Sequence, residues 1–478
     1  MELEANRFAE AASRALQDKQ LKAALDHNAR LADATRVKSM AATTGAEALR
    51  QQGRGARLRG LAQLPELLEQ TEAQITARGG QVLWAGDAEE ANQHVLAICQ
   101  RHGLRFGVKS KSMVTEELHL VPFLEEHGVR MLETDLGEFV VQVDESRPSH
   151  IVAPIMHMKK EGIHKLFVEK LGMEPMEDDI DPQVMTRFAR QYLRRRYFEA
   201  DFGITGGNFI IAETGTIAIT TNEGNARLGT ALQPVHVAIV GIEKVIPTWE
   251  DYATLVQTLA RSATGQQLSV YSTLYNGPAL PEEGDGPQHY YVILVDNGRS
   301  AIYGTQYSEA LACIRCGACL NTCPVYQNVG GHAYGAVYPG PIGSVITPLL
   351  TGVENATPLP FASSLCGACK AACPVDINIP DMLLGLRHDL QEEQGPLWRL
   401  GMQAWSWSFS HPLLYETGRK VSAALSGAFS GEDGKLRSLP GPLGAWTEHR
   451  DFPPFPQESF HDWWRRERDG QSGQDGDS

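Results

Sequence analysis

The sequence contains neither a long apolar run nor a long basic run. No stretch of its 478 residues approaches 18 consecutive apolar positions, so no membrane-spanning helix is expected. The net charge of −15 is spread along the chain, which argues against a nucleic-acid partner, because such a partner requires a basic footprint. Residues Met1 to Glu4 lack the basic and apolar segments of a secretory signal. We therefore expect a cytoplasmic protein, with contact to the inner face of the membrane through a partner left open.

Phosphate-binding loops are missing as well. The sequence has no G-x-G-x-x-G loop, no Walker loop and no convincing flavin signature, so no dinucleotide, ATP or flavin site is predicted. Cysteine is scarce: there are eight, and seven of them fall between positions 313 and 373. The eighth, Cys99, follows the apolar stretch 95–98 and is expected to be a buried core thiol.

The seven clustered cysteines form two motifs. The first has the spacing C-x2-C-x2-C-x3-C-P and consists of Cys313, Cys316, Cys319, Cys323 and Pro324. The second keeps only the last part of this spacing, in Cys366, Cys369, Cys373 and Pro374. In bacterial ferredoxins three thiolates of such a run hold one four-iron cluster, and the fourth, before the proline, ligates the neighbouring cluster. The motifs therefore predict two iron–sulfur clusters.

The spacing also assigns ligands to each cluster. Cluster 1 is expected to be held by Cys313, Cys316, Cys319 and, crossing over from the second motif, Cys373. Cluster 2 is expected to be held by Cys366, Cys369 and the crossing Cys323. Cluster 2 is then one thiolate short, and Ser363 stands where the missing cysteine would be. Three interpretations remain: a three-iron cluster, a four-iron cluster with Ser363 or another non-cysteine ligand, or a four-iron cluster with one open iron.

Two other uses of clustered cysteines fit less well. A structural zinc site takes four ligands per metal, often including histidine, and seven cysteines in two runs that end in Cys-Pro do not divide in this way. Disulfides are disfavoured by the odd number of clustered cysteines and by the lack of a secretory signal.

Composition and periodicity divide the chain into five regions. The predicted regions are a helical lead-in (1–70), an α/β domain (71–304), a mainly helical ferredoxin-like domain (305–392), a tryptophan-rich region (393–465) and a disordered tail (466–478). The Gly/Arg-rich stretch 52–57 is expected to break the helical lead-in, and the Gly/Pro-rich stretch 330–343 to form turns between the motifs. Six of the eight tryptophans follow residue 390, a position suited either to an interface or to packing of a loop-rich tail: Trp398, Trp405, Trp407, Trp446, Trp463 and Trp464.

Short β-rich runs alternate with helical stretches in the α/β region. Strands are predicted at 81–85, 105–108, 139–143, 209–212, 216–220, 236–240 and 290–295. Helices are predicted at 112–127 and 250–263, and at 381–390 beyond the cysteines. Several strands are apolar on both faces, which is typical of a sheet covered by helices on both sides.

Polar residues gather in two places outside the cysteine motifs. The glycine-rich stretch 203–216 places Glu213 at a strand–turn–strand junction, and the polar stretch 222–227 follows it. Lys109 and Lys111 follow a predicted strand and precede a predicted helix, a position where an anion could bind. These three residues are candidates for a catalytic site. The alternative is that Glu213 satisfies turn hydrogen bonds and the lysines are solvated.

Several of these segments resemble the lactate-utilisation family, and most closely its iron–sulfur subunit: residues 212–216, 222–227, the connection 331–343 and the two Cys-Pro motifs. The resemblance covers residues 70 to 460, and the three-cysteine second motif is similar to the family's own pattern. It implies an α/β LUD domain related to the sugar-phosphate isomerase and CoA-transferase superfamily, fused to a domain with two 4Fe-4S clusters. It also implies two partners, the other proteins of a three-protein system.

The function that this resemblance implies is electron transfer as L-lactate is oxidised to pyruvate, with each cluster carrying one electron at a time. The electron acceptor is left open. In one rival hypothesis the chain is itself catalytic, with Glu213 as the base, Lys109 and Lys111 holding the substrate carboxylate, or with substrate bound at an open iron of cluster 2. In another the clusters are structural and the α/β domain binds a metabolite.

Overall fold

The computed structural model describes residues 3–177, 179–390, 396–431, 433–439, 441, 444, 447 and 450–472. The chain divides after Leu390 into two compact units, residues 1–390 and 391–478. Trp446 and the final part of the predicted tail, residues 473–478, lie outside the described residues.

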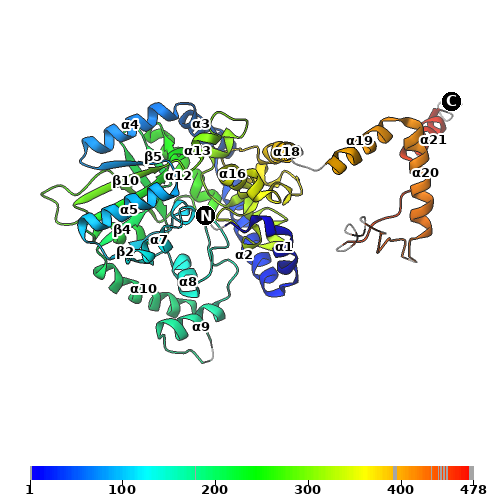
Figure 1. Cartoon of the computed structure of the whole chain (residues 1–478). Helices are drawn as coiled ribbons and strands as arrows, with labels where there is room; N and C mark the ends of the chain where they lie inside the picture. The colour runs from blue at the N-terminus through cyan, green and yellow to red at the C-terminus, as the bar shows by residue number, and fades with distance from the viewer. Residues whose placement is uncertain are drawn as a thin grey trace. The chain divides into compact units, whose positions relative to one another are not determined.

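A six-stranded parallel sheet forms the centre of the first unit (Figure 1). Its strand order is β1-β10-β7-β4-β2-β3, and every neighbouring pair is parallel. The strands are β1 (Gln81–Ala85), β2 (Phe106–Lys109), β3 (Arg130–Glu133), β4 (Phe202–Thr205), β7 (Val235–Gly241) and β10 (His289–Val295). The chain passes from β2 outward to β3 and then returns to the other side of β2 through β4, β7 and β10. Such a reversal leaves a crevice at the carboxyl ends of the two strands beside it, here β2 and β4.

Both faces of this sheet are buried, as the apolar runs predict. Along β10, Ile293 packs among residues of α5 (Ala88–His102), whereas its neighbour Leu294 packs among residues of α4 (Leu64–Ala77) on the opposite face. Alternate side chains of one strand thus enter two separate cores, because successive residues of a strand point to opposite faces.

A second sheet of four strands has the order β8-β5-β6-β9. Its strands are β5 (Phe209–Ile211), β6 (Thr216–Thr221), β8 (Val245–Ile246) and β9 (Tyr271–Tyr275). Strands β5 and β6 are antiparallel, and Glu213 lies in the turn between them, as predicted. Gly215 in the same turn has a φ of 65°, a conformation that glycine adopts without a steric penalty.

Six of the seven strands predicted from the sequence are strands in the structure. The exception is the run 139–143, which lies in helix α8 (Leu136–Asp144). The prediction is wrong because Asp135 caps this helix, its carboxylate accepting hydrogen bonds from the backbone of Gly137 and Glu138. The predicted helix at 112–127 is two shorter helices, and the other two predicted helices form as expected.

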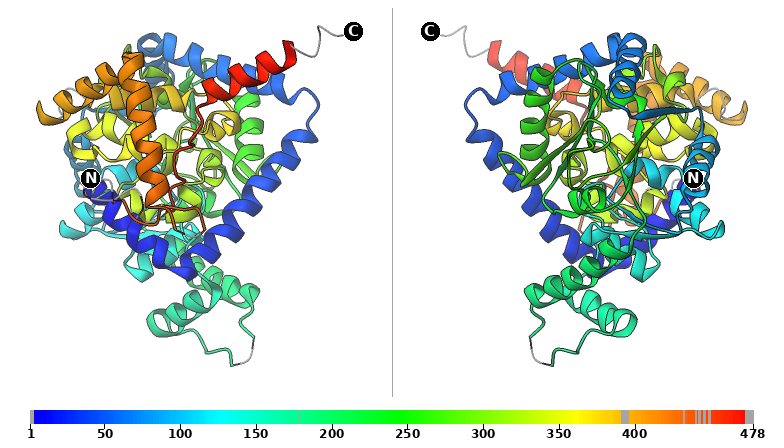
Figure 2. Two further views of the ribbon diagram at one scale, coloured as in Figure 1. Left: turned by 90° about the vertical axis from the view of Figure 1, so that its right-hand side faces the viewer. Right: turned by 90° about the vertical axis from the view of Figure 1, so that its left-hand side faces the viewer.

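The remaining helices of the first unit cover the sheets and surround the cysteines. They are α1 (Phe8–Gln17), α2 (Lys19–Ala41), α3 (Ala46–Ala62), α6 (Met113–Glu117), α7 (Leu120–Glu126), α9 (Lys160–Leu171), α10 (Pro182–Glu199), α11 (Asn225–Ala231), α12 (Trp249–Thr264), α13 (Arg299–Ile302), α14 (Ala318–Asn321), α15 (Tyr326–Val329), α16 (Gly340–Thr351), α17 (Ala368–Ala372) and α18 (Ile379–Asp389). Figure 2 shows the N-terminal helices (dark blue) alongside the cysteine-rich region (yellow). One contact between them is a hydrogen bond of 3.4 Å from Lys22 Nζ to the Gln327 carbonyl.

Helix α3 joins the α/β domain to the cysteine-rich region. Its Arg57 is 1% exposed and donates hydrogen bonds to the carbonyls of Leu311 and Ala312 on one side, and of Glu243 and Val245 on the other. A buried guanidinium can remain charged here because carbonyl oxygens replace its water.

The predicted break at residues 52–57 is therefore wrong, since α3 runs through it without interruption. Its glycines allow close packing instead of ending the helix. A Cβ at Gly60 would lie 2.6 Å from the Val245 carbonyl oxygen, so only glycine lets α3 approach β8 this closely.

The second unit contains α19 (Pro396–Ser410), α20 (Pro412–Ala428) and α21 (Phe460–Ser472). Trp398, Trp405 and Trp407 are all more than half exposed along α19. Residues 466–472, which the sequence predicts to be part of a disordered tail, lie in α21. The Ser459 hydroxyl caps this helix by accepting a hydrogen bond from the Asp462 backbone at 3.0 Å.

Candidate iron–sulfur site and adjoining cavity

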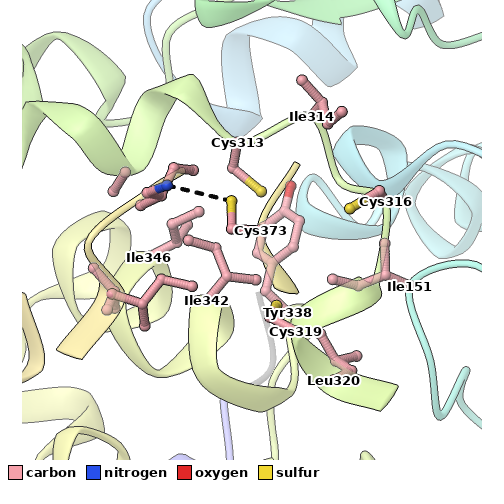
Figure 3. Close-up of a cluster of buried hydrophobic side chains, with 14 of the residues drawn as sticks. Ile151, Cys313, Ile314, Cys316, Cys319, Leu320, Tyr338, Ile342, Ile346 and Cys373 are labelled. Carbon is pink, nitrogen blue, oxygen red and sulfur yellow. Dashed lines mark hydrogen bonds between the residues drawn. The ribbon is translucent and has the colours of Figure 1, made fainter. Parts of the chain in front are cut away.

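Four cysteines from both motifs surround one small cavity (Figure 3). Cys313, Cys316 and Cys319 of the first motif are joined there by Cys373 of the second, and none is more than 9% exposed. Burial, together with the neighbouring thiols of Cys313, Cys316 and Cys373, raises the pKa of Cys319 well above its usual value. We call these four residues the first cysteine group.

The other three cysteines, Cys323, Cys366 and Cys369, form a second cysteine group. Burial and the nearby Cys323 raise the pKa of Cys369 to about 11. Cys366 is exposed, and the backbone N–H of Ala368 and the Ser364 hydroxyl lower its pKa. The second group therefore reaches the protein surface, which the first does not. In neither group, nor elsewhere among the described residues, are three His, Cys, Asp or Glu side chains placed to hold a single metal ion.

The two motifs repeat one backbone conformation. Left-handed φ angles flank the corresponding cysteines, at Arg315 (58°) and Gly317 (75°) in the first motif and at Leu365 (54°) and Gly367 (79°) in the second. Residues other than glycine adopt such angles rarely, so their recurrence at matching positions indicates a shared structural demand. The conformation turns backbone N–H groups toward the sulfur atoms.

Ser363 occupies in the second motif the position of Cys313 in the first. The Arg315 backbone N–H donates to Cys313 Sγ at 3.4 Å, and the Leu365 backbone N–H donates to Ser363 Oγ at 3.1 Å. A further bond of this kind, 3.3 Å from the Ile377 N–H to Cys373 Sγ, is the dashed line in Figure 3. Hydrogen bonds to ligand sulfurs tune iron–sulfur clusters, so this chemistry fits the predicted cofactor.

Buried cations lie beside the first cysteine group. Lys244 Nζ donates to the Cys313 carbonyl at 3.4 Å, and Arg315 lies between Cys313 and Cys316 in the chain. Burial and the neighbouring Arg315 lower the pKa of Lys244 to about 7. Burial opposes the charge of Arg315 too, but Cys313, Tyr338 and Glu243 keep its pKa raised. Arg315 therefore places a positive charge next to Cys313, whereas burial shifts Lys244 toward its neutral form.

A separate cavity of about 440 Å³ lies at the carboxyl ends of β2 and β4. The residues after β2, from Ser110 to Ser112, and those after β4, from Gly206 to Asn208, form part of its wall. The end of β6 and the stretch 222–225 form another part. Lys244, Arg315 and Tyr338 close it on the side of the cysteine-rich region. This is the crevice that the strand order predicts.

The structure separates the three catalytic candidates named from the sequence. Lys111 lines the cavity, where its Nζ donates to the Val152 carbonyl at 3.1 Å. Lys109 is fully buried in ion pairs with Glu133 at 2.8 Å and Glu116 at 3.2 Å, and does not line the cavity.

Glu213 does not line the cavity either. It is exposed, and its carboxylate accepts a hydrogen bond from the Trp249 backbone at 3.1 Å, at the start of α12. Sequence reasoning missed Lys244, Arg315 and Tyr338 as cavity residues. Arg315 could have been identified from its position inside the first cysteine motif. The spacing of the motif, however, assigns no role to the residues between its cysteines.

Family models match three successive parts of the chain. A LUD domain model matches residues 68–295, a 4Fe-4S dicluster domain model matches 309–377, and a model for the C-terminal region of lactate utilisation protein B matches 391–469. The fold and site thus define an α/β LUD domain followed by a 4Fe-4S dicluster domain, as predicted. No helix among the described residues is both long and apolar enough to span a membrane.

Curated relatives extend this match to most of the chain. The sequence is 46% identical to lactate utilization protein B of Shouchella clausii over 407 residues, covering 84% of this chain and 85% of that protein. It is 45% identical to the Geobacillus kaustophilus protein of the same name, with the same coverage, and 44% identical to that of Bacillus licheniformis, covering 85% and 86%. The chain belongs to the lactate utilisation protein B family, which confirms the resemblance noted from the sequence.

One crystal structure, a DUF162 family protein from Deinococcus radiodurans, is similar over 48% of this chain and 98% of its own, at 16% identity and a TM-score of 0.27. A similarity this low adds nothing to the description of the fold.

Proposed function

We propose that this chain is the iron–sulfur electron-transfer subunit that acts in the oxidation of L-lactate to pyruvate, together with the other two proteins of the lactate-utilisation system. The observation that carries the proposal is the separation of seven cysteines into two groups, one buried and one open to the surface at Cys366. Two one-electron carriers, one inside and one at the surface, form a relay that can pass the two electrons of a hydroxy acid one at a time.

The first cysteine group would hold a 4Fe-4S cluster with all four thiolates. The second would hold another with Cys323, Cys366 and Cys369, and Ser363 stands at the position of the fourth ligand. The match between Ser363 and Cys313 in backbone angle and hydrogen bond supports this placement. The clusters supply the one-electron chemistry when bound, while the chain's backbone N–H groups and buried cations stabilise the negative charge of the thiolates.

The proposal is tested with the full chain purified without oxygen, alone and with the two partner proteins. Iron and sulfide analysis is expected to give about eight of each per chain. L-lactate should reduce the clusters, seen by EPR, only when the partners are present. Clusters that stay oxidised in the complete three-protein mixture, or zinc in place of iron, would contradict the proposal.

A further inference from the structure

The cavity at the ends of β2 and β4 has no role in the relay described above. Its wall joins polar groups of the α/β domain to Arg315 of the first cysteine motif. Ile151 and Arg315 line this cavity and also the small cavity of the first cysteine group. A ligand in the larger cavity would therefore be separated from the first cysteine group by a single layer of side chains.

The positive side chains of the wall pair with carboxylates at the long end of ion-pair distance: Lys111 lies 3.6 Å from Glu138, and Lys244 and Arg315 each lie 3.7 Å from Glu243. Lys111, Lys244 and Arg315 line the cavity, against Asp135 and Glu223. The Arg315 side chain is 9% exposed, and its nearest carboxylate oxygen, Glu243 Oε1, is 3.7 Å from Nη2. The other oxygen of Glu243 is already paired with Arg299 at 2.6 Å.

Buried polar atoms of this wall have no hydrogen-bond partner in the part of the chain that the structure describes. They are Arg315 Nη1, Ser110 Oγ, Thr220 Oγ1 and Asn225 Oδ1. Buried polar atoms are normally paired, so several unpaired ones around one cavity indicate a polar occupant. The unpaired guanidinium nitrogen calls for an anionic acceptor, and the hydroxyl and amide oxygens call for a second polar group close to it.

We propose that this cavity binds a 2-hydroxy or 2-oxo carboxylic acid, with its carboxylate held by Arg315 and Lys111 and its second oxygen at Thr220 and Asn225. The inference rests on the proposed function, because it identifies the substrate class of the same system. Apolar side chains, among them Ile219, Leu259 and Ala263, complete the wall and would face the carbon chain of the acid. Such a mixture of apolar wall and few polar groups is typical of small-molecule sites.

The competing explanation is that Lys244 and Arg315 serve only to balance the charge of cluster 1. The test therefore uses cavity residues that do not contact the cysteines. Lys111→Met removes a cation from the wall, and Thr220→Val removes an unpaired hydroxyl at nearly constant volume. The matched control is Lys165→Met on α9, because the Lys165 side chain is 74% exposed and lies outside the cavity.

Binding of L-lactate, pyruvate and acetate is measured by calorimetry on the anaerobic, iron-loaded full chain. We expect L-lactate and pyruvate to bind more tightly than acetate, which lacks the second oxygen. Lys111→Met should weaken their binding by about tenfold or more, as loss of a charge-assisted hydrogen bond does. Thr220→Val should weaken it less, and Lys165→Met should bind like the unchanged protein. Iron content and melting temperature show whether each variant is folded; if Lys111→Met is not, Thr220→Val decides.

The proposal is overturned if acetate binds as well as L-lactate, if both cavity variants bind like the control, or if neither hydroxy nor oxo acid binds. Its failure is distinguishable from failure of the proposed function. If the isolated chain binds no acid while L-lactate still reduces its clusters through the partners, only the cavity inference is wrong. If it binds the acids in the cavity while the clusters stay oxidised in the complete mixture, only the electron-transfer role is wrong.

Discussion

All four cysteines of the first group are buried, whereas the second group opens to the surface at Cys366. Both motifs use the same left-handed backbone turns and the same N–H bond to the residue at the first ligand position. What differs is what surrounds them. The first group has buried cations, helix α3 and the adjoining cavity around it. In the second group Cys323 and Cys369 are buried, and Cys366 is exposed to solvent.

The spacing of the cysteines predicts which of them ligate each cluster, whereas the surroundings of a cluster set its reduction potential and its stability. Reduction potential and lability of a cluster depend on hydrogen bonds, nearby charge and exposure to solvent. We therefore expect the buried cluster to be the more persistent one and the surface cluster the one that exchanges electrons with a partner.

The largest expected effect comes from removing a cysteine that crosses between the motifs. Cys373→Ser should abolish the buried cluster, and Cys323→Ser should abolish the surface cluster although Cys323 belongs to the first motif. Each should lower the iron content from about eight to about four per chain. Iron analysis gives the number, and EPR of the reduced protein shows which signal remains.

Cys369→Ser is the matched control for this pair, because it should remove the same signal as Cys323→Ser. If Cys369→Ser instead removes the signal lost in Cys373→Ser, the crossing assignment is wrong and each motif holds its own cluster.

Two arginines of α3, which hold backbone carbonyls of the two cysteine motifs, test how burial changes what such a contact contributes to stability. Arg57 is 1% exposed and holds the carbonyls of residues 311 and 312, just before Cys313. Arg57→Met leaves several buried carbonyls without a hydrogen-bond donor. It should therefore lower the free energy of unfolding by about 3–5 kcal/mol. Arg50 holds the Cys373 and Lys370 carbonyls at 2.8 and 2.9 Å, but its side chain is 18% exposed. Because water can replace some of the hydrogen bonds of this guanidinium, Arg50→Met should lower the free energy of unfolding by about 1 kcal/mol.

Denaturant unfolding of the iron-loaded protein, followed by tryptophan fluorescence and cluster absorbance, measures both variants. Equal losses would show that burial does not determine how much these α3 contacts contribute to stability.

The sequence predicts how the seven cysteine side chains group, because the cysteine before the proline of each motif is expected to join the cysteines of the other motif. The structure has this grouping. Their role as ligands stays a prediction.

The parallel sheet could also be predicted, since Ile293 and Leu294 both belong to an apolar run suited to burial on two faces. The cavity could not, because its wall combines residues as distant as Lys111 and Arg315, which only the strand order and α3 bring together. The glycine-rich stretch around Glu213 suggests a catalytic site from the sequence, but in the structure this stretch forms a hairpin turn.

A chelator should separate the two groups by rate. With ferricyanide and EDTA under anaerobic conditions, the iron near Cys366 should be lost several-fold faster than the iron of the buried group, because the reagents reach only the surface. The iron content should therefore fall in two phases of similar amplitude. A single phase would mean that exposure at Cys366 does not control access to the cluster.

The smallest change in iron content is expected from substitutions of Ser363. These substitutions test whether Ser363 is the fourth ligand of the surface cluster. Ser363 Oγ already accepts the Leu365 N–H at 3.1 Å, as Cys313 Sγ accepts the Arg315 N–H. A thiolate in this place would meet the same N–H, so Ser363→Cys should keep about eight irons and slow the fast phase of iron loss. Ser363→Ala removes the oxygen and should leave about seven irons after mild oxidation, with a three-iron EPR signal. Ser308→Ala, whose hydroxyl donates to the carbonyls of Ile302 and Thr305 and to no cysteine, is the control and should keep about eight. If Ser363→Ala also keeps about eight, the fourth iron has no ligand from Ser363 and is open to a small molecule.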